Sequence, residues 1–190
     1  LRYDFTILPP MKIGSEYDKT FGHYHAQHDS QYSYPELYEV LHGEAHYVLQ
    51  ERRMEGKEPA VDDGVGRVFV VHAKAGDKVI VPPNFGHVTV NKGSEPLVMD
   101  NLVEAFFKSD YAPYKARKGA AVYITEKGVQ PNPNYPQAVK AVSLPAATFN
   151  KFVNAKLAGA LERKKSYALF IEEPELFEFL TEPELCAFKT

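Results

Sequence analysis

Two histidine-rich segments limit what this chain can fold into. The first, residues 19–43, reads KTFGHYHAQHDSQYSYPELYEVLHG and places His23 and His25 two positions apart. Because alternate side chains of a strand point to the same face, both imidazoles would lie on one side of a rigid backbone. Two imidazoles held in this way form half of a site for a first-row transition metal. The segment therefore predicts a metal site built on a strand.

A carboxylate and a third imidazole would complete such a site, and the chain supplies both. Glu36 opens a second strand-like run, with six residues between it and Gly43. The second segment, AGDKVIVPPNFGHVTVN, has a Gly-Asp turn, an apolar strand ended by two prolines, and a histidine that opens the next strand. The predicted metal ligands are His23, His25, Glu36 and His87.

Together the two segments resemble the double signature of the cupins, small antiparallel β-barrels with a metal ion at the centre. The patterns are G(x)5HxH(x)3-4E(x)6G and GD(x)4PxG(x)2H(x)3N. The matching positions are His23, His25, Glu36, Gly43, Gly76, Asp77, Pro82, His87 and Asn91. Tyr17 and Asn84 replace two glycines of the pattern, and ten residues separate His25 from Glu36 in place of three or four.

The long gap leaves Asp29 as an alternative carboxylate ligand, because it lies closer to His25. We prefer Glu36, since only this residue has the pattern's distance to Gly43. Residues 28–35 would then form an inserted loop before the second strand.

A narrower resemblance covers about residues 3–135. The runs T-x-GHYHA, PELYEVLHGEAHYVLQ and VIVPPNFGHVTVN are similar to the archaeal, cupin-type phosphoglucose isomerases. The resemblance implies a glucose-6-phosphate isomerase that interconverts glucose 6-phosphate and fructose 6-phosphate in glycolysis and gluconeogenesis. It also implies a cytoplasmic homodimer with one divalent metal ion per subunit, Fe²⁺ first and Mn²⁺, Ni²⁺ or Zn²⁺ as alternatives.

The same resemblance suggests roles for individual residues. Substrate and phosphate contacts fall on Thr6, Thr20, Gly22, Tyr38 and Tyr111. Catalytic positions fall on Glu36 and Tyr38, whereas a further phosphate-contacting tyrosine of the family would fall near Val103. Glu36 could be a base, a ligand or both, because a metal-assisted hydride shift needs no base. Proton transfer through a cis-enediolate therefore stays open beside the hydride shift.

Composition excludes several other classes. With a net charge of -3 and a pI near 6.2, the chain has no general affinity for nucleic acid. No apolar run reaches the ~18 residues of a membrane span. The single cysteine, Cys186, excludes an internal disulfide and fits a reducing cytosol. The remaining alternatives are a metal cupin dioxygenase and a non-catalytic sugar-binding cupin, and the intact set of four ligands disfavours the second.

Many short apolar runs with frequent turns predict an all-β fold. We expect a cupin (jelly-roll) antiparallel β-barrel at residues 1–144, which would be the catalytic domain. Strands are expected at 3–8, 37–41, 45–50, 67–72, 78–81, 88–90, 120–125 and 138–142, and residues 97–107 are another apolar run. The second and third of these would form a hairpin around Gly43, and the charged residues 51–66 would form a solvated loop.

Residues 145–190 have a different character and predict a C-terminal extension that packs on the barrel or at a dimer interface. An amphipathic helix is expected from Pro145, because large apolar residues recur at spacings of three and four. These residues are Phe149, Phe152, Val153, Leu157 and Leu161. A strand is expected at 166–171, and the two PEL sequences predict two short turns of helix.

Overall fold

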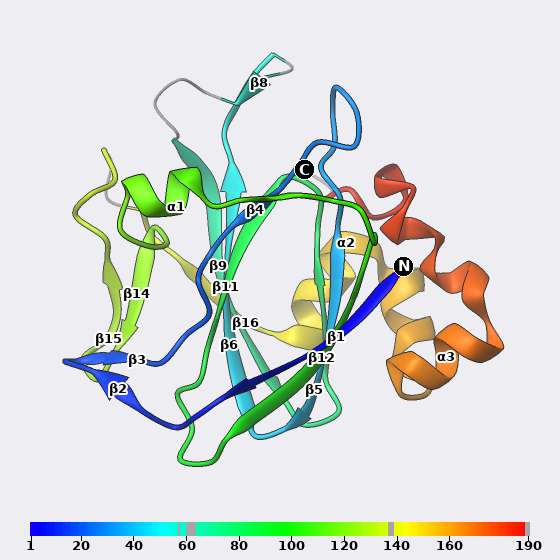
Figure 1. Ribbon diagram of the computed structural model, residues 1–190, viewed down its shortest axis with the longest axis horizontal. Helices are drawn as coiled ribbons and strands as arrows, with labels where there is room; N and C mark the ends of the chain where they lie inside the picture. Colours follow the sequence, from blue (N-terminus) through cyan, green and yellow to red (C-terminus); the bar gives the residue numbers. More distant parts are fainter. Residues whose placement is uncertain (57, 60–63, 137–138, 189–190) are drawn as a thin grey trace.

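The computed structural model describes residues 1–56, 58–59, 64–136 and 139–188. Two four-stranded sheets form the barrel (Figure 1). The first sheet has the order β1 (Arg2–Leu8), β12 (Leu97–Val103), β5 (Glu36–His42) and β10 (Lys78–Val81). The second has the order β11 (Phe85–Val90), β6 (Glu44–Arg52), β9 (Val65–Lys74) and β16 (Val142–Pro145). All neighbours are antiparallel except β16, which is parallel to β9.

Shorter elements surround the barrel. The strands β2 (Lys12–Ile13), β3 (Glu16–Tyr17), β14 (Val122–Thr125) and β15 (Gly128–Pro131) form one small sheet. Two further pairs are β4 (Tyr24–His25) with β13 (Ser109–Asp110), and β7 (Met54–Glu55) with β8 (Glu58–Pro59). The helix α1 (Ala112–Ala116) follows β13. The expected loop at 51–66 therefore contains the β7–β8 pair, and its residues 57 and 60–63 lie outside the described part.

The second sheet is buried on both faces. Along β6, Tyr47 and Leu49 belong to a core shared with the first sheet, whereas Val48 packs with Tyr114 in a separate cluster on the other face. Residues 45–50 of β6 and all six residues of β11 are accordingly buried. The all-β cupin barrel expected from the sequence is confirmed.

The hairpin expected around Gly43 is wrong. β5 pairs with β10 and β12 of the first sheet, whereas β6 pairs with β9 and β11 of the second. The chain changes sheet at Gly43, whose φ is 80°. A side chain there would also meet the carbonyl oxygen of Pro96, 2.8 Å from the position of a Cβ atom. Glycine is required here because the backbone is left-handed and crowded.

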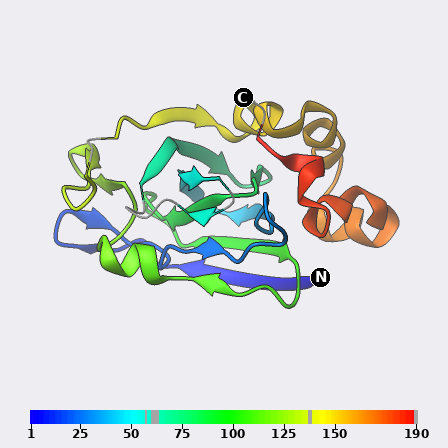
Figure 2. The same cartoon turned by 90° about the horizontal axis from the view of Figure 1, so that it is seen from above.

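The C-terminal extension is helical: α2 (Ala146–Leu161), α3 (Ser166–Glu172), η1 (Pro174–Leu180) and η2 (Pro183–Cys186). Figures 1 and 2 show it gathered at one side of the barrel. The expected helix forms, but it has a kink at Asn154, whose side-chain oxygen accepts the backbone N–H groups of Lys156 and Leu157. Asn154 thus caps the second half of α2. The two PEL sequences form η1 and η2, as expected.

Two strand predictions in this region are wrong. Residues 166–171 form α3, because a short apolar run fits a buried helix as well as a strand and tertiary contacts decide between them. The expected strand at 138–142 is displaced to β16, and residue 138 lies outside the described part. β16 continues directly into α2, for which Pro145 is the N-terminal boundary.

Polar contacts hold the extension against the outer face of the first sheet. Asn150 of α2 bonds both to Ile80 N and to the Lys78 carbonyl, which satisfies the backbone of the edge strand β10. Glu39 of β5 is fully buried and accepts the Ser166 N–H at 2.6 Å. Its carboxylate also lies 2.9 Å from Lys165 Nζ. A carboxylate near the first N–H groups of α3 favours helix there, which contributes to the failed strand prediction.

Apolar packing completes this attachment. Phe149, Val153 and Leu161 of α2 are buried in the same cluster as Tyr47 and Leu49 of the barrel. Phe152, in contrast, has half of its surface exposed. Among the described residues, no helix combines the length and the apolarity needed to cross a membrane.

Candidate metal centre

Four side chains from three separate parts of the chain converge at one end of the barrel. The nitrogen and oxygen atoms that could bind an ion lie within 4.8 Å of one another. The group consists of His23, His25, Glu36 and His87. Glu36 Oε2 lies 3.2 Å from His25 Nε2 and also 3.2 Å from His87 Nε2. The structure thus brings together all four residues that the sequence pattern singled out.

Backbone pairing positions these histidines. His23 and His87 face each other in an isolated antiparallel bridge, with N–H to carbonyl bonds of 3.4 and 3.1 Å in the two directions. His25 lies in β4, which pairs with β13. Its Nδ1 is 2.8 Å from the carbonyl oxygen of Tyr34. Because a carbonyl only accepts, Nδ1 carries the proton and Nε2 presents a lone pair to the centre of the group.

The inserted loop explains how Glu36 reaches the site despite the long gap. The Tyr34 backbone N–H donates a hydrogen bond to the Ala26 carbonyl, and Gln27 faces Ser33 in an isolated antiparallel bridge. The two ends of the inserted loop therefore lie next to each other. Asp29 is exposed at the tip, where it accepts the N–H groups of residues 31 and 32. The structure therefore does not bring Asp29 to the histidines.

The electrostatics of the group suit a cation. Burial, reinforced by His87 and His25, lowers the pKa of His23 to about 3. Burial likewise lowers the pKa of His87. Burial also opposes ionisation of Glu36, but its contacts with His25 and His87 outweigh this and lower its pKa. The imidazoles of His23 and His87 are therefore neutral and Glu36 is ionised at neutral pH.

Two of the candidate ligand atoms, His25 Nε2 and Glu36 Oε2, are buried and have no hydrogen-bond partner among the described residues, although they lie 3.2 Å apart. Buried polar atoms are normally paired, and two acceptors so close together repel unless positive charge lies between them. Three neutral imidazoles and one carboxylate are ligands that divalent transition metals accept. The residues present therefore fit a metal ion.

Aromatic rings surround the centre. The Phe107 ring lies 4.1 Å from the His25 ring, and Tyr111 lies 5.1 Å from His23, between centroids. Phe21 packs edge-on against Tyr111. The Tyr38 hydroxyl lies 3.1 Å from His87 Nε2. Sequence reasoning singled out Tyr38 and Tyr111 but missed Phe107, because a lone phenylalanine in a loop carries no pattern.

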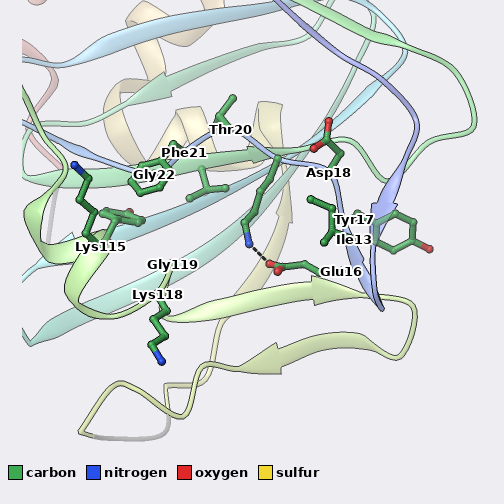
Figure 3. Close-up of a pocket in the computed structure, with 13 residues that line it drawn as sticks. Ile13, Glu16, Tyr17, Asp18, Thr20, Phe21, Gly22, Lys115, Lys118 and Gly119 are labelled. Atoms are coloured by element: carbon green, nitrogen blue, oxygen red, sulfur yellow. Dashed lines mark hydrogen bonds and ion pairs between the residues drawn. The ribbon is translucent and has the colours of Figure 1, made fainter.

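The expected phosphate-binding residues come from β1 and from the segment that precedes β4. Thr20 accepts the Thr89 N–H through its hydroxyl, and Thr6 is partly exposed on β1. Thr20 and Gly22 line a pocket of about 570 Å³ together with Lys115 and Lys118 (Figure 3). A Cβ atom on Gly22 would lie 2.2 Å from the Tyr114 ring. Gly22 is therefore required by packing, whatever else it does.

The departures from the cupin pattern have local explanations. Asn84 takes the place of a glycine and adopts a left-handed backbone with a φ of 65°. Asparagine tolerates this conformation better than most residues. Val103 is fully buried in β12 and directly opposite Glu36, so the phosphate-contacting tyrosine expected near it has no counterpart at that position.

The barrel and its buried three-histidine, one-glutamate group define this chain as a cupin with a candidate metal centre. A family model described as Glucose-6-phosphate isomerase (GPI) matches residues 1–140. The chain belongs to the glucose-6-phosphate isomerase family.

Named relatives are archaeal and bacterial. A glucose-6-phosphate isomerase of Thermococcus gammatolerans is 32% identical over 67% of this chain and 59% of its own length. One of Thermococcus litoralis is 28% identical over 71% of this chain and 64% of its own. A putative glucose-6-phosphate isomerase 2 of Rhizobium meliloti is 30% identical over 67% of this chain and 56% of its own length. The chain thus spans about three fifths of the length of these relatives.

Solved structures resemble the chain only loosely. The Drosophila melanogaster CENP-C cupin domain has a TM-score of 0.36 and 12% identity, covering 53% of this chain and 58% of its own. A Klebsiella pneumoniae protein with a double-stranded β-helix domain has a TM-score of 0.37 and 22% identity, and the match covers 57% of this chain and 69% of that protein's chain. At these scores neither structure informs the function of this chain.

Proposed function

We propose that this chain is a metal-dependent glucose-6-phosphate isomerase that interconverts glucose 6-phosphate and fructose 6-phosphate in the cytoplasm, as a step of glycolysis and gluconeogenesis. The observation that carries the proposal is the buried group of His23, His25, Glu36 and His87, in a chain whose family model is that of this isomerase. The free, buried Cys186 fits a reducing compartment.

The four residues of this group would hold one divalent ion. Fe²⁺ is our first choice, and Mn²⁺, Ni²⁺ and Zn²⁺ also suit imidazole with carboxylate. When bound, such an ion supplies positive charge beside the sugar oxygens on which negative charge develops.

The residues of the chain have separate roles in this reaction. The Glu36 carboxylate, which is ionised, would move a proton between C1 and C2, whereas in a metal-assisted hydride shift it would be a ligand only. Tyr38, two residues further along β5 and on the same face as Glu36, would orient the sugar, and Tyr111 would cover it from the loop. Thr6, Thr20 and Gly22 would contact the phosphate through hydroxyl and backbone N–H groups, which are good donors to an anion.

Removal of the metal is expected to abolish isomerase activity. A coupled assay on fructose 6-phosphate would be run on the purified chain, after treatment with a chelator, and after addition of Fe²⁺ or Mn²⁺. We expect activity to be lost on chelation and restored by the ion, because the buried atoms His25 Nε2 and Glu36 Oε2 have no hydrogen-bond partner within the described part of the chain and would bind a cation. Unchanged turnover in a sample shown to be metal-free by elemental analysis would contradict metal dependence.

We also propose a homodimer. β1 is an edge strand of the first sheet, and on its outer face Phe5 and Ile7 are 61% and 66% exposed. Nearby α3 exposes Ile171 by 63% and, through Tyr167, contacts Tyr3 of β1. Exposed apolar side chains beside an edge strand favour pairing with a second copy. The extension would then border the interface.

Light scattering on the full chain should therefore give twice the mass of one chain. Phe5→Glu should shift the mass to that of one chain, because it places a charge in the interface. Val129→Glu, at a position 40% exposed on β15, is the matched control and should remain dimeric. A monomeric full chain would rule out the dimer.

A further inference from the structure

Three polar residues form a row across adjacent strands of the first sheet. Tyr38 of β5 lies opposite Asn101 of β12, and Asn101 lies opposite Asp4 of β1. The preceding row of the same sheet, two residues nearer the metal centre, consists of Glu36, Val103 and Arg2. Directly opposed residues of antiparallel strands point to the same side. Successive rows two residues apart also share a face, so the polar row faces the same side as Glu36.

Contacts around these residues support this assignment. The Arg2 guanidinium lies 5.3 Å from the centre of the Phe107 ring, which in turn packs on His25. Burial raises the pKa of the Tyr38 phenol, followed by the charge of Glu36, and Asp4 makes a smaller electrostatic contribution. The intervening residues of β1, Phe5 and Ile7, point outward and are exposed. Arg2 and Asp4 therefore lie on the side of the metal centre.

The row has hydrogen-bonding capacity that the described residues do not use. Asn101 is 5% exposed, and its side-chain amide makes no hydrogen bond to another described residue. Arg2 Nε donates to Asp4 Oδ2 at 2.6 Å, which fixes the carboxylate and leaves its second oxygen available within the described part. The amide atoms of Asn101 are not among the fully buried unpaired atoms of the described residues, so they are accessible to a ligand. A carboxylate and an amide side by side on a sheet suit a ligand with several hydroxyl groups.

We propose that Asp4 and Asn101 bind the hydroxyl groups in the middle of a phosphorylated polyol or sugar. This rests on the proposed function, because the metal centre would hold one end of the molecule and Thr6 the phosphate at the other. Asp4 accepts from one hydroxyl, while Asn101 donates to or accepts from its neighbour. Neither residue belongs to a recognisable sequence motif.

Distances along the sheet agree with this arrangement. Thr6 lies in the row after Asp4, opposite Met99 and on the same face. Rows two residues apart are separated by about 6.7 Å, so about 13 Å separates the row of Glu36 from that of Thr6. An extended six-carbon sugar phosphate with bonds of about 1.5 Å measures roughly 11 Å between its terminal oxygens, which is comparable with this separation.

The test is equilibrium binding to the metal-loaded protein by titration calorimetry. The first probe is sorbitol 6-phosphate, which carries the hydroxyls but has no carbonyl to isomerise. The second is propyl phosphate, which has the phosphate and no hydroxyls. We expect Asp4→Asn and Asn101→Ala each to weaken sorbitol 6-phosphate binding about tenfold. Propyl phosphate binding and metal content should not change.

Asp29→Asn is the matched control, because it makes the same chemical change on the exposed loop and should leave both affinities unchanged. Thermal unfolding of each variant checks folding. If Asn101→Ala does not fold, the binding data for Asp4→Asn alone test the inference. This variant is expected to fold because Asp4 is partly exposed. The inference is overturned if both folded variants bind sorbitol 6-phosphate like the wild type, if propyl phosphate affinity falls in parallel, or if the wild type does not bind sorbitol 6-phosphate.

A separate turnover assay distinguishes this inference from the proposed function. If the wild-type protein binds sorbitol 6-phosphate through Asp4 but does not isomerise fructose 6-phosphate, the binding role of the polar row stands and the proposed isomerase activity is refuted. If the protein is an active isomerase and the variants bind sorbitol 6-phosphate like the wild type, the isomerase activity stands and the binding role of the polar row is refuted.

Discussion

Replacing His25 with alanine is expected to remove both metal binding and isomerase activity. The Tyr34 carbonyl fixes His25 through Nδ1, so that Nε2 faces Glu36 and the other imidazoles. Among the described residues, the metal-binding group has four members and His25 is fully buried within it. Losing one imidazole leaves the ion without a replacement ligand. We expect activity to fall by at least on the order of 10²-fold, with a parallel loss of bound metal.

His28→Ala is the control for this experiment. His28 is exposed on the inserted loop, where its ring packs against Tyr34. Elemental analysis and turnover should both remain close to wild type. Full metal occupancy with normal turnover in His25→Ala would refute the assignment of the metal centre.

The second large effect is expected at Glu36. Glu36→Gln keeps the shape of the side chain and removes the negative charge that lies between His25 and His87. We expect a loss of at least on the order of 10²-fold in turnover, because both metal affinity and proton transfer depend on that charge. Asp29→Ala should leave metal content and turnover nearly unchanged, since Asp29 only caps a turn of the loop.

Isotope incorporation would separate the two roles of Glu36. If its carboxylate transfers the proton, the product formed in deuterated water should carry deuterium at the carbon that receives it. A product without deuterium would favour a direct hydrogen shift and leave Glu36 as a ligand only. The opposite pattern of mutant effects, with Asp29 essential and Glu36 dispensable, would show that the spacing to Gly43 was misinterpreted.

Local spacing was sufficient to find the residues of the metal centre. His23 and His25 alternate on one backbone segment, and Glu36 is located by its distance to Gly43, where the chain must turn with a left-handed φ. Such constraints act between near neighbours along the chain, so a sequence records them directly. The cupin barrel follows from the same pattern, because each spacing in the pattern corresponds to one strand and one turn.

Tertiary structure alone decided which strands are neighbours. β5 and β6 follow each other in the sequence and are joined at Gly43, and this spacing favoured a hairpin. In the structure the two strands belong to different sheets. Each strand finds its partners through apolar contacts with distant segments. The same holds for α3, whose apolar residues 166–171 suit either a strand or a helix until Glu39 of β5 binds the backbone at Ser166.

The sequence by itself therefore determined the four residues of the candidate metal centre, the barrel class and the amphipathic helix of the extension. Only the tertiary structure placed Phe107 on His25 and aligned Asp4, Asn101 and Tyr38 in one row. Asp4 and Asn101 are 97 positions apart in the numbering, and the residues of the row share no motif. Their proximity comes from the register of β1, β12 and β5, which hydrogen bonds between strands fix only when the sheet forms.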